Sequence, residues 1–95
     1  MQTEVEKRQF TVRLKDGVAH INRVNDNAWH FYHKDIQGTI LRSWNGLAGR
    51  TYSVGNIRER SGIVLMHQVP GSFRKLEDAI QAAWRHSAME RSRAR

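Results

Sequence analysis

Histidine has the widest chemistry of the residue types in this chain, and two of its five histidines, His30 and His33, lie three positions apart. Imidazole nitrogens bind transition metals, so this pair is the first candidate for a metal site. On a β-strand, however, positions 30 and 33 point to opposite faces, and the chain has no cysteine to complete a ligand set. We therefore predict no metal site and no metal cofactor.

A metal-free ribonuclease is the enzymatic alternative that the residue types leave open. In such an enzyme a histidine acts as acid or base, and arginines stabilise the charged transition state. The residues of suitable type are His20, His30, His33, Tyr32, Tyr52 and Glu59. Their spacing singles out no catalytic constellation, so we predict no catalytic residue, no cofactor and no enzymatic activity, and keep the ribonuclease as the lesser alternative.

Positive charge is the strongest feature of the composition. Sixteen Lys and Arg against nine Asp and Glu give a formal net charge of +7, and most of the cations are arginine. A guanidinium donates in a flat fork that matches phosphate and stacks on bases, which an ammonium does less well. Between Ile36 and Leu76 the only acid is Glu59. This local excess of arginine predicts a surface that faces a polyanion.

The segment from Trp29 to His33 alternates aromatic and imidazole rings. Trp29 and Phe31 share one face and are expected in the core, whereas His30 and Tyr32 point the other way. Exposed rings on a sheet can stack on unpaired bases while nearby cations hold the backbone. The predicted nucleic-acid-binding residues are Arg13, Lys15, His20, His30, Tyr32, Arg42, Arg50, Arg58 and Arg60.

A β-hairpin is predicted at the start of the chain, because apolar and polar residues alternate on both sides of Asp16-Gly17. This dipeptide favours a two-residue type I′ turn, which would place Lys15 opposite Val18. One face of the hairpin would then be apolar, and the other polar and positive. The expected apolar residues are Phe10, Val12, Leu14, Ala19 and Ile21, and the expected polar residues are Thr11, Arg13, Lys15, His20 and Asn22. A two-stranded ribbon of this kind is narrow enough for the major groove of DNA.

Turn-forming residues divide the middle of the chain into further strands, with turns at residues 25–27, 34–35, 45–46 and 61–62. The alternative to the tight turn at Asn45-Gly46 is a longer loop from Asn45 to Gly49. The predicted strands cover residues 29–33, 36–44, 50–57 and 63–69. The last of these contains the longest apolar run and is expected to be central and buried, with His67 in the interior or half-exposed. Gly38 is a candidate β-bulge, and Trp44 is expected in the core.

From Leu76 onward the hydrophobic period becomes helical, with Leu76, Ala79, Ile80, Ala83 and Trp84 on one stripe. The sequence therefore predicts an α+β fold, in which one antiparallel sheet of five or six strands, joined as meander-like hairpins, packs against one C-terminal α-helix. A single domain is expected over residues 9–88, with a flexible segment at 1–8 and a basic, frayed tail at 89–95.

The charged start of the chain and the shortness of its apolar runs predict neither a signal peptide nor a membrane span, and the lack of cysteine favours the cytoplasm. The function predicted first is that of a small nucleic-acid-binding accessory or regulatory protein, acting as monomer or homodimer through a positively charged sheet face. The alternative is a protein-binding adaptor or inhibitor of the phage or mobile-element kind, because arginine and aromatic rings are also enriched at protein interfaces.

Overall fold

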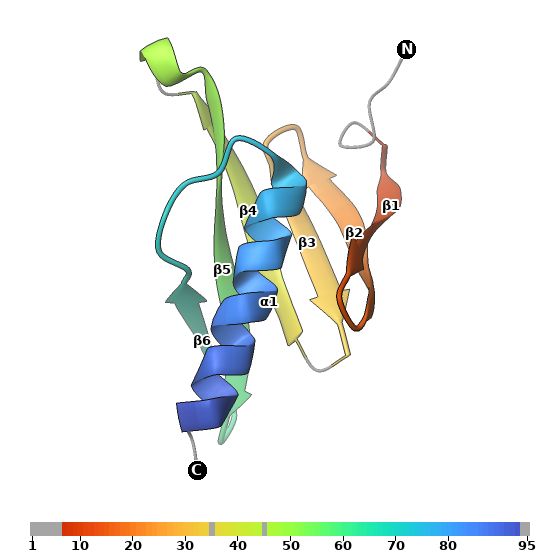
Figure 1. The fold of residues 1–95 in the computed structure, drawn as a ribbon, viewed down its shortest axis with the longest axis vertical. Coiled ribbons are helices and arrows are strands. Elements are labelled where there is room, and N and C mark those ends of the chain that lie inside the picture. Colours follow the sequence, from red (N-terminus) through yellow and green to blue (C-terminus); the bar gives the residue numbers. More distant parts are fainter. Residues whose placement is uncertain (1–6, 35, 45, 94–95) are drawn as a thin grey trace.

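The computed structural model describes residues 7–34, 36–44 and 46–93, without the side chains of residues 48, 58–60 and 90–93. Within this part of the chain, six strands form one antiparallel sheet in sequence order, and a helix follows them (Figure 1). The elements are β1 (Gln9–Leu14), β2 (Gly17–Asn25), β3 (Ala28–His33), β4 (Ile36–Trp44), a 3-10 turn at Gly46–Ala48, β5 (Arg50–Arg60), β6 (Ile63–Gln68) and α1 (Leu76–Arg93). The predicted α+β fold is confirmed.

One face of the sheet packs against α1 and forms the core. In β1 and β3 alternate side chains are buried on this face, as the alternation in the sequence predicts. The helix lies mainly across β5, β4 and β1 (Figure 1). The core consists of Val12, Leu14, Ala19, Ile21, Trp29, Phe31, Ile40, Tyr52, Val54, Val69, Leu76, Ala79, Ile80, Ala82 and Ala83. Trp84 is partly buried against this cluster.

The first hairpin has the predicted faces but not the predicted register. Leu14 pairs with Gly17, so Lys15 and Asp16 are the two turn residues, and Arg13 pairs with Val18 rather than with His20. Neither turn residue has a positive φ, which a type I′ turn would require. The reason is a long-range contact, because the turn is held by a histidine on β3.

That histidine is His33, which is buried. Its Nε2 lies 2.8 Å from a carboxylate oxygen of Asp16, and its Nδ1 lies 3.1 Å from the carbonyl oxygen of Val18. Both partners are acceptors, so the ring donates to both when it is protonated. The Cε1 atom of His33 also lies over Gly17, so that a Cβ added to Gly17 would be only 2.9 Å from this Cε1. Lys34 adds a second contact to Asp16 at 3.2 Å.

Gly38 pairs with Phe31 in regular register and is not a bulge, contrary to the prediction. A Cβ at this position would meet the backbone oxygen of Gly55 and would lie 2.6 Å from the Phe31 ring. The glycine is therefore needed because the aromatic ring fills its place on the core face. The irregularity in the sheet lies instead in β2, between Arg23 and Asn25.

The prediction that the strand from Ile63 to Val69 is central and buried is wrong. This strand, β6 (Ile63–Gln68), forms the edge of the sheet, and all of its six residues are exposed, including His67. The apolar run suggested burial, but α1 lies over other strands. Among the seven residues predicted for this strand, only Val69, just beyond its end, is buried.

The prediction that Trp44 lies in the core is also wrong, since 71% of this residue is exposed. It stands at the end of β4, where the β4–β5 hairpin extends past the rest of the sheet (Figure 1). No core element reaches this hairpin end, so the indole packs only against its cross-strand neighbour. Arg50 pairs with Trp44, and its guanidinium carbon lies 5.6 Å from the centre of the indole ring.

The backbone of α1 continues to Arg93, through most of the predicted frayed tail. Residues 1–6 of the predicted flexible segment, and residues 94–95, lie outside the described part of the chain. In the part that is described, no helix has both the length and the apolar character needed to cross a membrane.

We predict that Gly38→Ala lowers the free energy of unfolding by about 1 to 3 kcal/mol, because the added methyl group overpacks the core against Phe31. Urea unfolding measures the change. Ser43→Ala, on the exposed part of the same strand, is the matched control and is expected to leave the midpoint nearly unchanged. Equal stability of the two variants would contradict the packing argument.

A second prediction concerns pH. The hydrogen bond from His33 lowers the pKa of the Asp16 carboxyl, so the folded state holds the ionised form more tightly than the unfolded chain does. This contribution is fully present above the ordinary pKa of aspartate and is lost as the pH falls through the lowered value. The stability difference between the natural chain and Asp16→Asn should therefore shrink between about pH 5 and pH 2. A difference that stays constant over this range would contradict the assignment.

Candidate nucleic-acid interface

The face of the sheet opposite α1, which we call the open face, is the largest surface that the fold leaves uncovered. Cross-strand partners lie on the same face, so the register defines two rows across it. The first row is Thr11, His20, Tyr32, Gln37, Ile57 and Met66, and the second row is Gln9, Asn22, His30, Thr39, Gly55 and Gln68. Its rings, hydroxyls and amides give this face donors, acceptors and stacking surfaces together.

His20 and Tyr32 form the central feature of the open face. They are direct cross-strand partners on β2 and β3, and their ring centres lie 5.2 Å apart with an angle of 19° between the planes. Both residues remain exposed, Tyr32 to 45%. His30 lies on the same face, in the next row, and is half-buried. The structure thus brings together the three predicted ring residues.

A shallow hollow of about 320 Å³ lies beside this stack. It is lined by Gln9, Phe10, Thr11, His20, Ile21, Asn22 and Tyr32. Thr11 and Asn22 were predicted on the polar face of the hairpin but not as binding residues. The signal that could have identified them was their register, because they pair across the strands with His20 and His30. A planar ring placed in the hollow would have polar groups at its edge.

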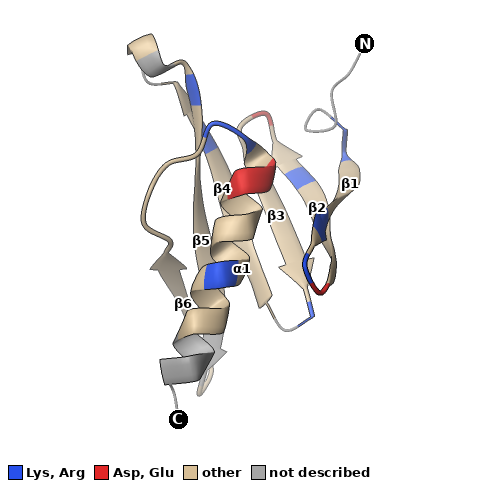
Figure 2. Cartoon of the chain, in the orientation of Figure 1, with Lys and Arg blue, Asp and Glu red and all other residues tan. Residues whose placement is uncertain are grey.

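Among the predicted cations, Arg13 is exposed on the open face, where it pairs with Val18. Lys15 is exposed in the adjacent turn. Figure 2 shows these positive positions on the β1–β2 hairpin, with the acidic Asp16 at its tip. No ion pair joins Arg13 or Lys15 to an acid in the described part of the chain, so both cations can meet an anionic ligand.

Arg42 lies on the opposite face, because it pairs with the buried Tyr52. Arg13 and Arg42, both among the predicted binding residues, therefore lie on different faces of the sheet. The Nε of Arg42 donates to the side-chain oxygen of Asn27 at 3.2 Å, and its Nη2 donates to the carbonyl oxygen of Asp26. The guanidinium carbon lies 5.1 Å from the centre of the buried Trp29 ring. Arg42 is thus part of the fold.

Arg23, on β2, has the same role as Arg42 beside the β2–β3 turn. Its Nε and Nη2 donate to the carbonyl oxygens of Asn25 and Asp26, each at 3.1 Å, and its guanidinium carbon lies 5.7 Å from the Trp29 ring centre. The two arginines together hold the β2–β3 turn over the indole. We call Arg23, Arg42 and Trp29 the arginine clamp.

Arg50, another of the predicted cations, does not lie on the open face. Arg50 lies on β5 at the far end of the β4–β5 hairpin, beside Trp44. The side chains of Arg58 and Arg60 lie outside the described part of the structure. Arg74 and Lys75 are exposed in the segment before α1, on the same end of the molecule as Arg50 (Figure 2). The positive charge is therefore spread over two separate surfaces.

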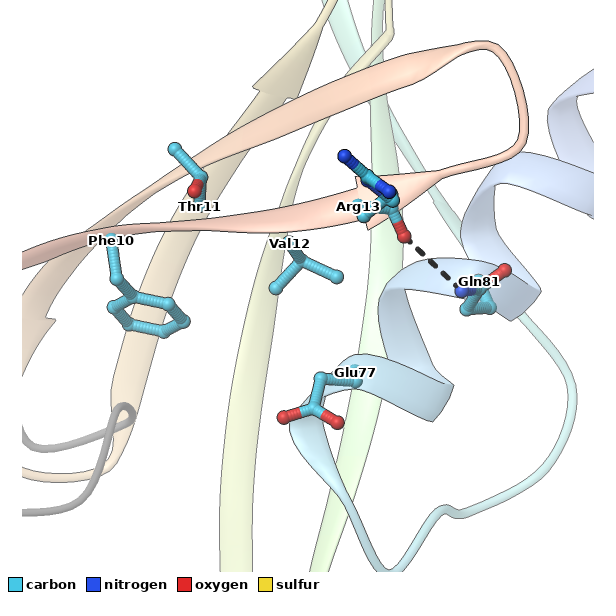
Figure 3. Close-up of a pocket in the computed structure, with 6 residues that line it drawn as sticks. All are labelled: Phe10, Thr11, Val12, Arg13, Glu77 and Gln81. Atoms are coloured by element: carbon cyan, nitrogen blue, oxygen red, sulfur yellow. Dashed lines mark hydrogen bonds between the residues drawn. The ribbon is translucent and has the colours of Figure 1, made fainter.

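A second hollow, of about 380 Å³, lies between β1 and α1 (Figure 3). Phe10 and Val12 from β1 and Glu77 and Gln81 from α1 line it, and Gln81 donates to the carbonyl oxygen of Arg13 at 3.4 Å. The carboxylate of Glu77 makes this hollow a poor place for an anion. Its main structural effect is that α1 shields the outer edge of β1.

Two observations concern the metal and the acid–base chemistry considered from the sequence. No group of three or more histidine or acidic side chains that could hold a metal ion lies among them. His33, one of the histidines considered for acid or base chemistry, is buried on the core face and bonded to Asp16. The arrangement at the open face is suited to stacking and hydrogen bonding.

Comparison of the chain with protein-family models, with curated proteins and with solved structures gives no match. The assignment of a function consequently rests on the geometry of this molecule.

The placement of the arginines generates a prediction that separates structural from binding roles. Arg42→Ala should lower the free energy of unfolding by about 1 to 3 kcal/mol, because Asn27 loses its charged donor and the Asp26 carbonyl keeps only the one from Arg23. Arg50→Ala removes only an exposed contact with Trp44 and should cost less than about 1 kcal/mol. Urea unfolding of both variants measures the difference, and a larger loss for Arg50→Ala would contradict the clamp.

Proposed function

We propose that this protein binds single-stranded nucleic acid on the open face of its sheet. The observation that carries the proposal is the exposed stack of His20 and Tyr32, flanked by the polar hollow and by Arg13. Bases have apolar faces and polar edges, and the open face offers rings for the former and hydroxyl or amide groups for the latter. Arg13 and Lys15 are placed at one end of the face to contact phosphates.

The width of the sheet favours a single strand over a duplex. Strands lie about 4.8 Å apart, so six of them span roughly 24 Å, twice the approximately 12 Å width of the major groove of DNA. The β1–β2 hairpin is not a free ribbon either, since β2 is also paired with β3. A single strand can instead lie across the face and present its bases to Tyr32 and His20.

The distribution of charge favours rings over cations as the main source of affinity. Arg23 and Arg42 are bonded within the fold, and Arg50 and Arg74 lie at the other surface. Among the side chains that the structure describes, Arg13 and Lys15 are the cations that we assign to the open face, and two cations would neutralise few phosphates. The expected salt dependence is therefore shallow, with a slope of log affinity against log salt of about −1 to −2.

The proposal predicts separate effects for rings and cations on this face. Tyr32→Ala should weaken binding by roughly five- to 150-fold, the range expected for one lost stack, while leaving the salt slope unchanged. Arg13→Gln should weaken binding less and reduce the salt slope by about 0.7, the value for one phosphate on a single strand. Arg85→Gln, on the exposed surface of α1, is the matched control for the loss of one positive charge.

Fluorescence anisotropy with labelled oligothymidine and oligouridine of about twelve nucleotides measures these effects, at fixed pH and several salt concentrations. Arg85→Gln should retain the natural salt slope. If neither oligonucleotide binds at low salt, or if Arg85→Gln weakens binding as much as Arg13→Gln, the proposed site is wrong. Absence of binding to any nucleic acid would instead favour the protein-binding alternative.

A further inference from the structure

The edge strand β6 carries an apolar surface that the fold does not cover. Four consecutive residues are exposed: Ile63 to 61%, Val64 to 66%, Leu65 to 44% and Met66 to 59%. The strand from Ile63 to Gln68 has no charged residue, although charged residues are frequent elsewhere in the chain. An exposed apolar edge without charge lacks the usual protection against pairing with another strand.

The backbone of β6 offers hydrogen bonds at this edge. The amide of Val69 donates to the carbonyl oxygen of Val54 at 2.9 Å, which fixes the phase of the β5–β6 ladder. In an antiparallel pair the direction of these groups alternates along the strand. The amides and carbonyls of Val64, Met66 and Gln68 therefore point away from β5, toward the open edge.

The opposite edge of the sheet, formed by β1, has a helix beside it. At β1, Gln81 of α1 donates to the outward-facing carbonyl of Arg13, and the helix closes a hollow beside the strand (Figure 3). At β6 no hydrogen bond from a described side chain reaches the outer edge. At β1 an outward-facing carbonyl is thus bonded by the helix, whereas the outward-facing groups of β6 are available to another strand.

We propose that β6 pairs antiparallel with β6 of a second copy of this chain, around a two-fold axis perpendicular to the sheet. One register combines a long overlap of the two strands with mainly apolar pairs. With Leu65 at the axis, residues 63–67 of both copies pair: Leu65 faces Leu65, Val64 and Met66 face each other twice, and only the outermost pair, Ile63 with His67, is mixed. With Val64 at the axis the pairs are apolar, but only residues 63–65 of the two strands overlap. With Met66 at the axis, Leu65 would face His67 and Val64 would face Gln68, which mixes apolar with polar residues.

The lack of charge on β6 argues against nucleic acid as the ligand of this edge. A nucleic acid gains nothing from an uncharged apolar edge, whereas a β-strand satisfies both its side chains and its backbone groups. A second copy brings a strand with the same uncharged apolar residues to this edge by symmetry, since an isologous contact uses the same patch twice. The two helices would lie on one side of a continuous sheet, and the two open faces would adjoin on the other. This inference does not depend on the proposed function.

The test uses the purified chain without nucleic acid. Sedimentation analysis should show a dimer, and Leu65→Lys should raise the dissociation constant at least about 100-fold, because it places two like charges against each other at the axis. Val24→Lys is the matched control, since Val24 is also an exposed apolar strand residue, to 64% against 44% for Leu65, but lies in β2. A monomeric natural chain at high concentration, or equal weakening by both variants, would overturn the proposal.

A single introduced cysteine tests the register, because the chain contains none of its own. Residue 65 does not bond outward, so the two copies of it form a non-hydrogen-bonded pair with Cα atoms about 4.5 Å apart, within reach of a disulfide. Leu65→Cys should therefore form a disulfide-linked dimer rapidly under mild oxidation. Met66→Cys should form it much more slowly, and the reverse order, or equal rates, would overturn the assigned register.

Discussion

The packing of one helix against one face of the sheet is the interaction on which the other features depend. Leu76 and Ile80 of α1 are fully buried against the strands, and burial of such side chains stabilises a fold by about 1.5 to 3 kcal/mol each. A single helix is narrower than six strands, so it covers β1, β4 and β5 best. The helix leaves the open face and β6 uncovered.

The arginine clamp shows why net charge is a poor guide to the binding surface. Arg23 and Arg42 contribute to the formal charge of +7, yet they hold the β2–β3 turn and lie over the buried Trp29. Both guanidinium groups lie over the indole and donate to backbone carbonyls, so they contribute to the fold. Among the described side chains the open face then has more rings than cations, and for this reason the proposal assigns most of the affinity to stacking.

Local alternation was enough to predict the sheet, the helix and the two faces of β1 to β3, because a strand fixes the side of each residue. It also placed His30 and Tyr32 opposite the core. Two errors came from contacts between distant residues: His33 holds the first turn, and the path of α1 leaves β6 exposed. The placement of Arg42 is different, because alternation with the buried Ile40 two positions earlier already puts it on the core face. An apolar run indicates burial only where another element covers it.

The central claim, that the open face receives a single strand, is tested most directly by mapping amide chemical shifts during titration with oligothymidine. The account predicts that shifts gather at the residues of the open face around Tyr32, namely Thr11, His20, Asn22, His30 and Thr39. Shifts centred instead on Arg50 and Arg74, at the other basic surface, or no shifts at all, would contradict it.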